Sequence, residues 1–186
     1  MKQASQVLGA ALIVLAFVAL EAGAQPRSDL DVQELGSALP DVHAVAEGLF
    51  PEDACEQLKA AGFKCMGYKP TLRYALPVSS FRGGSAELPD ALKKQLDVFA
   101  EVLRSRKGGR KAVRIEGHTD ASGSSAANIA LSQRRAEAVL DYLVERGADP
   151  AMLSAVGLGS SEPVDRRNPS SPENRRIEIV RAPNPS

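Results

Sequence analysis

The sequence of 186 residues has no tryptophan, only two cysteines and two histidines, and no excess charge, with 23 basic and 23 acidic side chains. The balanced charge argues against a nucleic-acid-binding protein, whose phosphate contacts need a surplus of Lys and Arg. Two cysteines and a distant His43 are too few ligands for a zinc site, and nothing in the sequence indicates a cofactor. Apolar residues make up 44% of the chain and charged residues 25%, which is typical of a globular protein.

The N-terminus carries the pattern of an export signal. Lys2 precedes a nearly unbroken apolar run over residues 7–20, followed by the small residues Ala22-Gly23-Ala24. This run is shorter than the roughly 20 apolar residues that a spanning helix needs, although a retained anchor is the alternative. We predict a signal peptide over residues 1–24, cleaved before Gln25, and therefore export to the periplasm. The first cysteine lies well beyond the cut, which excludes processing as a lipoprotein.

Export to an oxidising compartment changes the interpretation of the two cysteines. Cys55 and Cys65 form the only possible pair in the chain, and an oxidising compartment permits a disulfide. The spacing places Cys55 on a short helix that begins near Pro51, and Cys65 on the segment that returns from it. We predict a structural disulfide between them, with two unpaired thiols as the alternative.

The rest of the chain divides at about residue 70. Residues 25–70 form an N-terminal extension with weak helical patterning, which is too short for a large core of its own and is expected to pack partly against residues 71–183. Residues 71–183 are regular and predict an α+β two-layer sandwich, in the order β-α-β-α-β-β, with the helices on one face of a mixed sheet. The predicted elements are strands at 72–78, 113–117, 153–156 and 176–180, helices at 88–105 and 126–146, and a loop at 157–172.

The second predicted helix places a charged residue among apolar ones. On a helical wheel, Arg135 and Asn128 fall on the apolar stripe that faces the core, whereas Arg134 falls on the solvent side. A guanidinium directed at apolar neighbours needs a carboxylate or a bound anion as its partner.

Asp120 is the nearest candidate partner, because it follows the strand that precedes this helix. On the last strand Arg175 shares the face of the inward residues, and Arg176 alternates outward. His118 is expected to be exposed, since it has no second histidine or thiol as a partner. Two alternatives stay open: Asp120 and Arg135 form only a buried salt bridge, or the cluster binds a zwitterion, with the carboxylate holding an amine and arginine holding a carboxylate.

Four stretches together resemble a known family: residues 115–120 (IEGHTD), 128–136 (NIALSQRRA), 157–159 (GLG) and 174–179 (NRRIEI). In this order and spacing they are similar to the OmpA-like C-terminal domain. The resemblance implies a periplasmic or outer-membrane-associated domain that binds peptidoglycan non-covalently through the diaminopimelate of the stem peptide.

The resemblance also implies roles for particular residues. The family's aspartate and helix arginine, which hold the amine and the carboxylate of the ligand, fall on Asp120 and Arg135. Its other binding positions fall on Thr119, Asn128, Leu131 and Arg175. The chain departs from the family at Ala127, where an aromatic residue is common, and it lacks the cysteine pair that some members carry in the late loop.

We therefore expect a binding module whose partner is peptidoglycan, and residues 25–70 could contact an outer-membrane or other envelope protein. The alternative is a structural or protein-interaction module that keeps the fold without binding the cell wall. No nucleophile–base pair or metal cluster emerges from the sequence, so an enzyme is not predicted.

Overall fold

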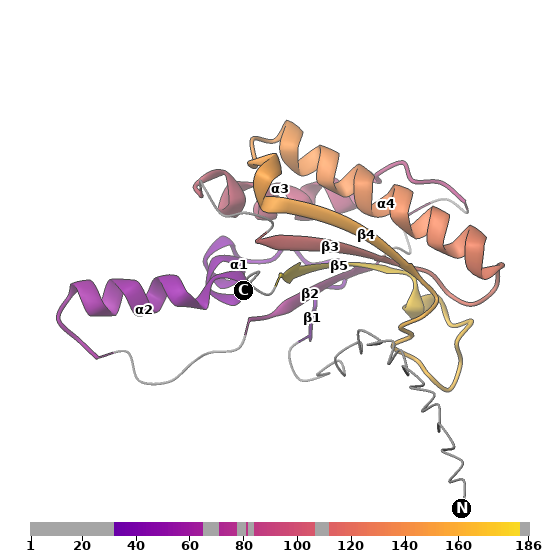
Figure 1. The fold of residues 1–186 in the computed structure, drawn as a ribbon, viewed down its shortest axis with the longest axis horizontal. Helices are drawn as coiled ribbons and strands as arrows, with labels where there is room; N and C mark the ends of the chain where they lie inside the picture. The colour runs from indigo at the N-terminus through magenta and orange to yellow at the C-terminus, as the bar shows by residue number, and fades with distance from the viewer. Residues whose placement is uncertain (1–31, 65–70, 78–80, 82–83, 107–111, 183–186) are drawn as a thin grey trace, which may run out of the picture.

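The computed structural model describes residues 32–64, 71–77, 81, 84–106 and 112–182. Strands and helices alternate along most of this length, as Figure 1 shows. The elements are β1 (Val32–Glu34), α1 (Val42–Leu49), α2 (Pro51–Ala60), β2 (Arg73–Pro77), α3 (Asp90–Arg104), β3 (Val113–His118), α4 (Ser125–Glu145), β4 (Leu153–Gly159) and β5 (Arg176–Arg181), with short 3-10 turns at Pro150–Met152 and Pro172–Asn174.

The strands form one mixed sheet in the order β1-β2-β5-β3-β4. β1 runs parallel to β2 and β3 parallel to β4, while β5 is antiparallel to both of its neighbours. The parallel pairs require crossovers, and helices supply them. The last strand therefore lies in the middle of the sheet, so the residues just before β5 come beside the end of β3.

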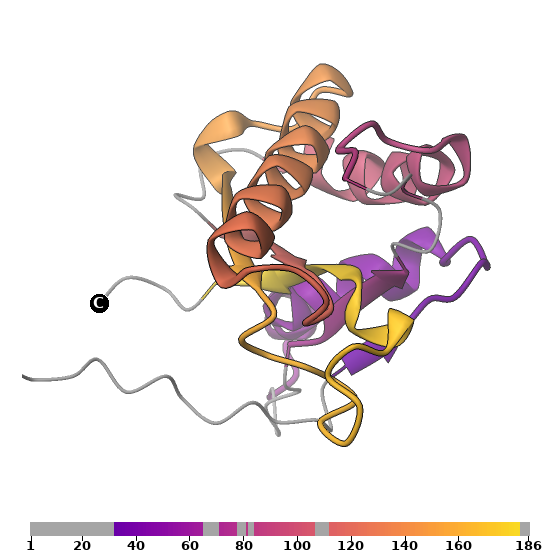
Figure 2. The ribbon, with the colours of Figure 1, turned by 90° about the vertical axis from the view of Figure 1, so that its right-hand side faces the viewer.

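Helices α3 and α4 cover one face of the sheet, as the two perpendicular views show (Figures 1 and 2). The apolar stripe of α3 is buried as its spacing predicts, and it packs on the inward residues of the strands. Helix α4 begins where the Ser124 side chain accepts a hydrogen bond from the Ala127 amide, and it ends before Gly147, whose φ of 98° suits glycine. The predicted fold class, an α+β sandwich with helices on one face of a mixed sheet, is confirmed.

The extension joins this structure instead of standing apart from it. β1 adds a strand to the edge of the sheet, and Val45, Leu49 and Phe50 are buried in the common core. Tyr74 of β2 donates a hydrogen bond to the carbonyl of Ala44, which lies in α1, at 2.8 Å. The packing of the extension against the rest, expected because the extension is too short for a large core of its own, is therefore observed. The domain boundary at residue 70 stays a prediction.

The end of β4 differs from the sequence prediction, and β1 is a strand that the sequence does not predict. The sequence predicts a loop at Gly157-Leu158-Gly159, but these residues are the end of β4 and pair with the end of β3. Glycine is used there because α4 approaches closely: a Cβ at Gly157 would lie 2.7 Å from the carbonyl oxygen of Ile129. At Gly117, the partner of Gly157 on β3, a Cβ would lie 2.8 Å from the carbonyl carbon of Ser132.

Two predictions fall on parts of the chain outside the described residues. The predicted signal peptide over residues 1–24 lies outside them, as does Cys65, whereas Cys55 lies within α2. The disulfide and the signal peptide therefore stay predictions. Within the described ranges, none of the helices has the length and apolar character needed to cross a bilayer.

Candidate functional site

The predicted site residues gather where β3 ends, α4 begins and β5 is about to start. Asp120 follows β3, and its Oδ2 accepts a hydrogen bond from Nη1 of Arg175 at 2.6 Å. Its Oδ1 accepts from the backbone amide of Ser122 at 3.0 Å and also from the Ser122 hydroxyl. Because these bonds fix both carboxylate oxygens, Asp120 presents a rigidly oriented negative group.

Electrostatics keep the Asp120 carboxylate ionised. Burial alone would raise its pKa, but the hydrogen bonds from Ser122 and Arg175 and the positive charge of Arg175 outweigh burial, so the pKa lies below its ordinary value. In the folded protein this carboxylate therefore keeps its charge throughout the neutral and mildly acidic range.

Arg135 is buried, as its place on the α4 stripe predicts, with 3% of its surface exposed. Its Nε donates to the backbone carbonyl of Ser85 at 2.9 Å, and its guanidinium lies over the ring of Phe81, 4.7 Å from the centroid. Burial lowers the pKa of Arg135, the nearby charge of Arg175 lowers it further, and Asp120 opposes both effects. The site thus combines two guanidiniums with one carboxylate within electrostatic reach.

Asn128 and Thr119 are both buried near Asp120, Asn128 through a hydrogen bond and Thr119 as its neighbour in the sequence. The Asn128 side chain donates to the Asp120 carbonyl at 3.0 Å and to the Gly123 carbonyl at 3.4 Å, so it fixes the loop that carries the carboxylate. Thr119 is 4% exposed, and within the described part of the chain its hydroxyl has no hydrogen-bond partner. A buried hydroxyl without a partner is costly, and a ligand that reaches it would remove that cost.

The remaining predicted residues are placed as follows. Leu131 is half-buried on α4, and Arg134 is exposed as predicted. Arg175 lies just before β5, with 37% of its side chain exposed, and pairs with Asp120. One alternative from the sequence was a buried salt bridge between Asp120 and Arg135. In the structure the Asp120 carboxylate forms its ion pair with Arg175 instead.

Sequence reasoning missed the residues that orient the two key charges. Ser122 holds Asp120, and Phe81 with Ser85 holds Arg135. An Asp followed two residues later by Ser is a recognisable turn signal, so Ser122 could have been found. Phe81 and Ser85 lie about fifty positions from Arg135, and no local pattern connects them to it.

The prediction for His118 is wrong, and Arg176 has the predicted orientation but a different environment from the one expected. The sequence predicts an exposed His118, but its side chain is fully buried. Arg176 does lie on the face opposite to the helices, as its alternation indicates, but it is buried there and not solvated: its Nε donates to Glu178 at 2.6 Å. The central side chains on this second face are therefore shielded from solvent, which the alternation of side chains along a strand cannot reveal.

The buried charges on this second face include a set of potential metal ligands. Glu116, His118 and Glu178 have ligand atoms within 4.8 Å of one another. However, Arg73 forms ion pairs with both glutamates, and Arg176 pairs with Glu178. A cation would have to compete with these guanidiniums, so the chemistry of the cluster fits a buried ion-pair network better than a metal centre.

The fold and the site define a two-layer α+β domain with a cluster of charged side chains at the ends of its central strands. The chain belongs to the OmpA family, whose model matches residues 80–176. It is similar to the peptidoglycan-associated lipoprotein of Pseudomonas aeruginosa, with 39% identity over 107 residues that cover 56% of this chain and 62% of that protein.

Two further similarities point the same way. The peptidoglycan-binding protein ArfA of Mycobacterium tuberculosis is 40% identical over 105 residues, which cover 54% of this chain and 31% of that protein. The crystal structure of a putative MotB-like protein from Desulfovibrio vulgaris matches with a TM-score of 0.52 and 22% identity, over 76% of this chain and 96% of that one, which supports the fold alone. The matched region spans less than two thirds of these two curated relatives.

Proposed function

We propose that this protein binds peptidoglycan non-covalently in the periplasm and so tethers or stabilises the cell envelope. The observation that carries the proposal is the cluster in which Asp120, fixed by Ser122 and Arg175, lies within electrostatic reach of the buried Arg135. The names of the two curated relatives, which both refer to peptidoglycan, support the same ligand.

The chemistry of the cluster suits the free end of a diaminopimelate side chain, which carries an amine and a carboxylate on one carbon. Asp120 can accept hydrogen bonds from the ammonium, and a guanidinium can bind the carboxylate in bidentate fashion. With two arginines for one aspartate, the cluster has one positive charge in excess, which favours a ligand that brings a carboxylate. The Thr119 hydroxyl, the Asn128 side chain and Leu131 complete the proposed contacts.

Co-sedimentation with purified sacculi that contain diaminopimelate tests this proposal. The unmodified protein should pellet with the sacculi, and Asp120→Ala and Arg135→Ala should stay in the supernatant. Arg134→Ala is the matched control, since Arg134 is the exposed neighbour of Arg135 on the same helix. Circular dichroism of each variant checks that the fold is kept.

Equal sedimentation of all four proteins would remove the site assignment. If the unmodified protein also fails to pellet, the domain keeps the OmpA fold for another task, such as a structural or protein-interaction role.

Two processing events belong to the same proposal. Export requires the predicted signal peptide over residues 1–24, and export would in turn allow Cys55 and Cys65 to form a disulfide. Mass spectrometry of the purified envelope protein would reveal both, as an N-terminus at Gln25 and a mass lower by two hydrogens than the dithiol form.

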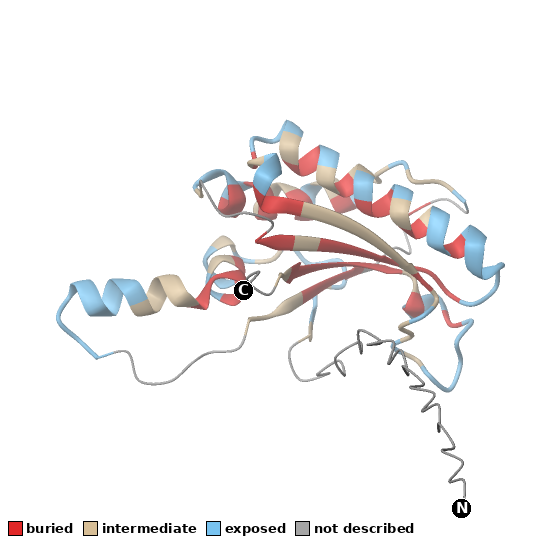
Figure 3. Cartoon of the chain, in the orientation of Figure 1, coloured by how far each residue is buried: buried red, intermediate tan, exposed pale blue. Residues whose placement is uncertain are grey.

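The extension is the proposed contact for an envelope protein. Helix α2 projects from the body (Figure 3). Leu58 in its last turn and Phe63, three residues after it, are 47% and 63% exposed. Its base is fixed by an ion pair between Glu52 and Arg181 at 2.9 Å and by Arg106, which pairs with Asp53 and stacks on Phe50. The double variant Leu58→Asp/Phe63→Asp should lose in vivo cross-links that form through α2, whereas its sedimentation with sacculi should be unchanged. Loss of both cross-links and sedimentation would mean that envelope-protein contact and wall binding are not separate roles.

A further inference from the structure

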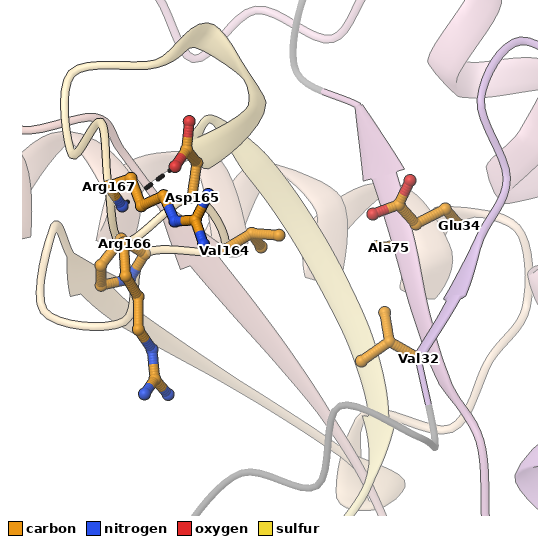
Figure 4. Close-up of a pocket in the computed structure, with 8 residues that line it drawn as sticks. Val32, Glu34, Ala75, Val164, Asp165, Arg166 and Arg167 are labelled. Atoms are coloured by element: carbon orange, nitrogen blue, oxygen red, sulfur yellow. Dashed lines mark hydrogen bonds between the residues drawn. The ribbon is translucent and has the colours of Figure 1, made fainter.

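A second recess lies on the face of the sheet that the helices α3 and α4 leave uncovered. It is a pocket of about 580 Å³, within the range of small-ligand sites. Strands β1 and β2 supply one side of it, and the loop after β4 supplies the other (Figure 4). The lining residues are Val32, Glu34, Ala75, Pro163, Val164, Asp165, Arg166 and Arg167.

The loop side of the pocket is held in place by a buried asparagine. Asn174 is fully buried, and its Oδ1 accepts a hydrogen bond from the Asp165 amide at 2.9 Å. Its Nδ2 donates to the carbonyls of Asn168 and Pro169 at 3.1 and 3.0 Å. Asp165 in turn accepts at its side chain from the Arg167 amide at 3.0 Å. This side of the pocket is therefore preorganised, which lowers the entropic cost of binding.

Glu34 gives the strand side of the pocket a negative charge, whereas Arg166 and Arg167 together with Asp165 leave the loop side with one positive charge in excess. The apolar floor of the pocket is defined by the other lining residues, Val32, Ala75, Pro163 and Val164. Glu34 stands on β1, and Arg166 and Arg167 stand on the loop (Figure 4). Across the described ranges, none of these three side chains takes part in an ion pair. A ligand that offers an ammonium group to Glu34 and a carboxylate to the arginines would satisfy both sides.

We propose that this pocket is a second binding site for a short zwitterionic peptide, and that in the cell wall its ligand is an uncrosslinked stem peptide. Such a peptide carries a free amine, a terminal carboxylate and the small methyl groups of alanine, which match the charges and the apolar floor of the pocket. The identification of the ligand as a stem peptide rests on the proposed function, whereas the presence of the pocket and of its charges is independent of that function.

The same loop connects the pocket to the Asp120 cluster. Pro169 accepts a hydrogen bond from the amide of Ala121, next to Asp120, at 2.9 Å, and Arg175 directly follows Asn174. One rigid loop thus carries residues of both sites. Two weak sites held at a fixed separation bind a polymer of repeated stem peptides more tightly than either site binds one peptide.

The test is an NMR titration of the full-length, isotope-labelled protein with the diaminopimelate-containing stem tetrapeptide. Two groups of amide shifts are expected, one around Asp120 and Ser122 and one around Ala75 and Val164. Asp120→Ala should remove the first group and keep the second. In the double variant Glu34→Gln/Arg167→Ala, the affinity measured from the second group of shifts should fall about fivefold, which is the upper range for an exposed charge pair. The affinity measured from the first group should stay unchanged. Arg134→Ala should change neither group.

The outcomes separate this proposal from the proposed function. Saturation of the Asp120 group without any shift at Ala75 or Val164 overturns the second site. The second site is also overturned if the second group of shifts disappears in Asp120→Ala, or if its affinity is unchanged in the double variant. Either result would mean that these shifts are an indirect effect of binding at the first site. Shifts confined to the pocket group would support the second site and contradict the assignment of Asp120.

Discussion

The sheet buries side chains on both of its faces, but the two faces use different chemistry. The face under α3 and α4 is apolar, with Leu76, Ile115, Ile177 and Ile179 fully buried among helix residues. The opposite face buries a network of charges, in which Arg73, Arg114 and Arg176 form ion pairs with Glu116 and Glu178. Strand β5 contributes alternate residues to each face.

This difference decides how each face responds to change. Apolar burial tolerates small losses, since each removed methylene costs a limited amount of free energy. A buried ion pair adds little net stability, but removal of one partner leaves the other charge buried without compensation. The charged face should therefore be the more sensitive one to single substitutions, although it contributes less to the stability of the fold.

The largest effect is expected for Glu178→Leu. It removes the partner that Arg73 and Arg176 share, and it should lower the free energy of unfolding by about 3–5 kcal/mol. Ile179→Val, on the neighbouring position of the apolar face, should cost only about 1 kcal/mol. Urea denaturation measures both. A smaller loss for Glu178→Leu than for Ile179→Val would reverse the comparison of the two faces.

A somewhat smaller effect is expected where α4 lies against the apolar face. Gly157→Ala places a methyl group against the backbone of Gln133 and Ile129, so the helix must shift, at a cost of about 1–3 kcal/mol. The amide signals of Asn128 and Arg135 should move with the helix. Ser154→Ala, elsewhere on the same strand and half-buried, serves as the control, with a change within about 0.5 kcal/mol. Equal stability of the two variants would mean that α4 is not held by close contact with Gly157.

Tyr74 supplies a pH-dependent effect on the apolar face. Burial raises the pKa of Tyr74 from 10.0 to about 12, so folding favours its neutral form. The stabilisation that Tyr74 provides through this shift is complete below pH 10 and should be lost as the pH rises from about 10 to 12. Tyr74→Phe, which also loses the hydrogen bond to Ala44, should cost about 1 kcal/mol at pH 7 and show a weaker dependence on pH above 10. Denaturation curves at several alkaline pH values measure this. An unchanged alkaline slope in the variant would mean that another group is responsible.

The smallest effect is expected for zinc addition to the charged face. Because Arg73 and Arg176 already neutralise Glu116 and Glu178, millimolar Zn²⁺ should leave the melting temperature within about 1 °C. A rise of several degrees that disappears in His118→Ala would instead identify a metal centre.

Much of the fold was predictable because its signals are local. The helix predicted at 126–146 is observed at Ser125–Glu145, and the inward turn of Arg135 follows from its position on the helical stripe. The pairing of β1 with β2 was not predictable, since three residues are too few to give a strand pattern. The sequence predicts a loop at Gly157 because a glycine in a strand looks like a break until the helix packed against it is known.

The sequence by itself determined the order of the elements from β2 to β5, the apolar face of the sheet, the inward arginine of α4 and the motifs of the OmpA family. These features depend on the periodicity of apolar residues and on residues that are close in the chain, so they can be read directly from the sequence. The tertiary structure alone decided that Asp120 pairs with Arg175, that Arg135 rests on Phe81, and that His118 and Arg176 are buried. Alternation along a strand states which residues share a face, but only the folded chain determines what covers that face and which distant charges meet there.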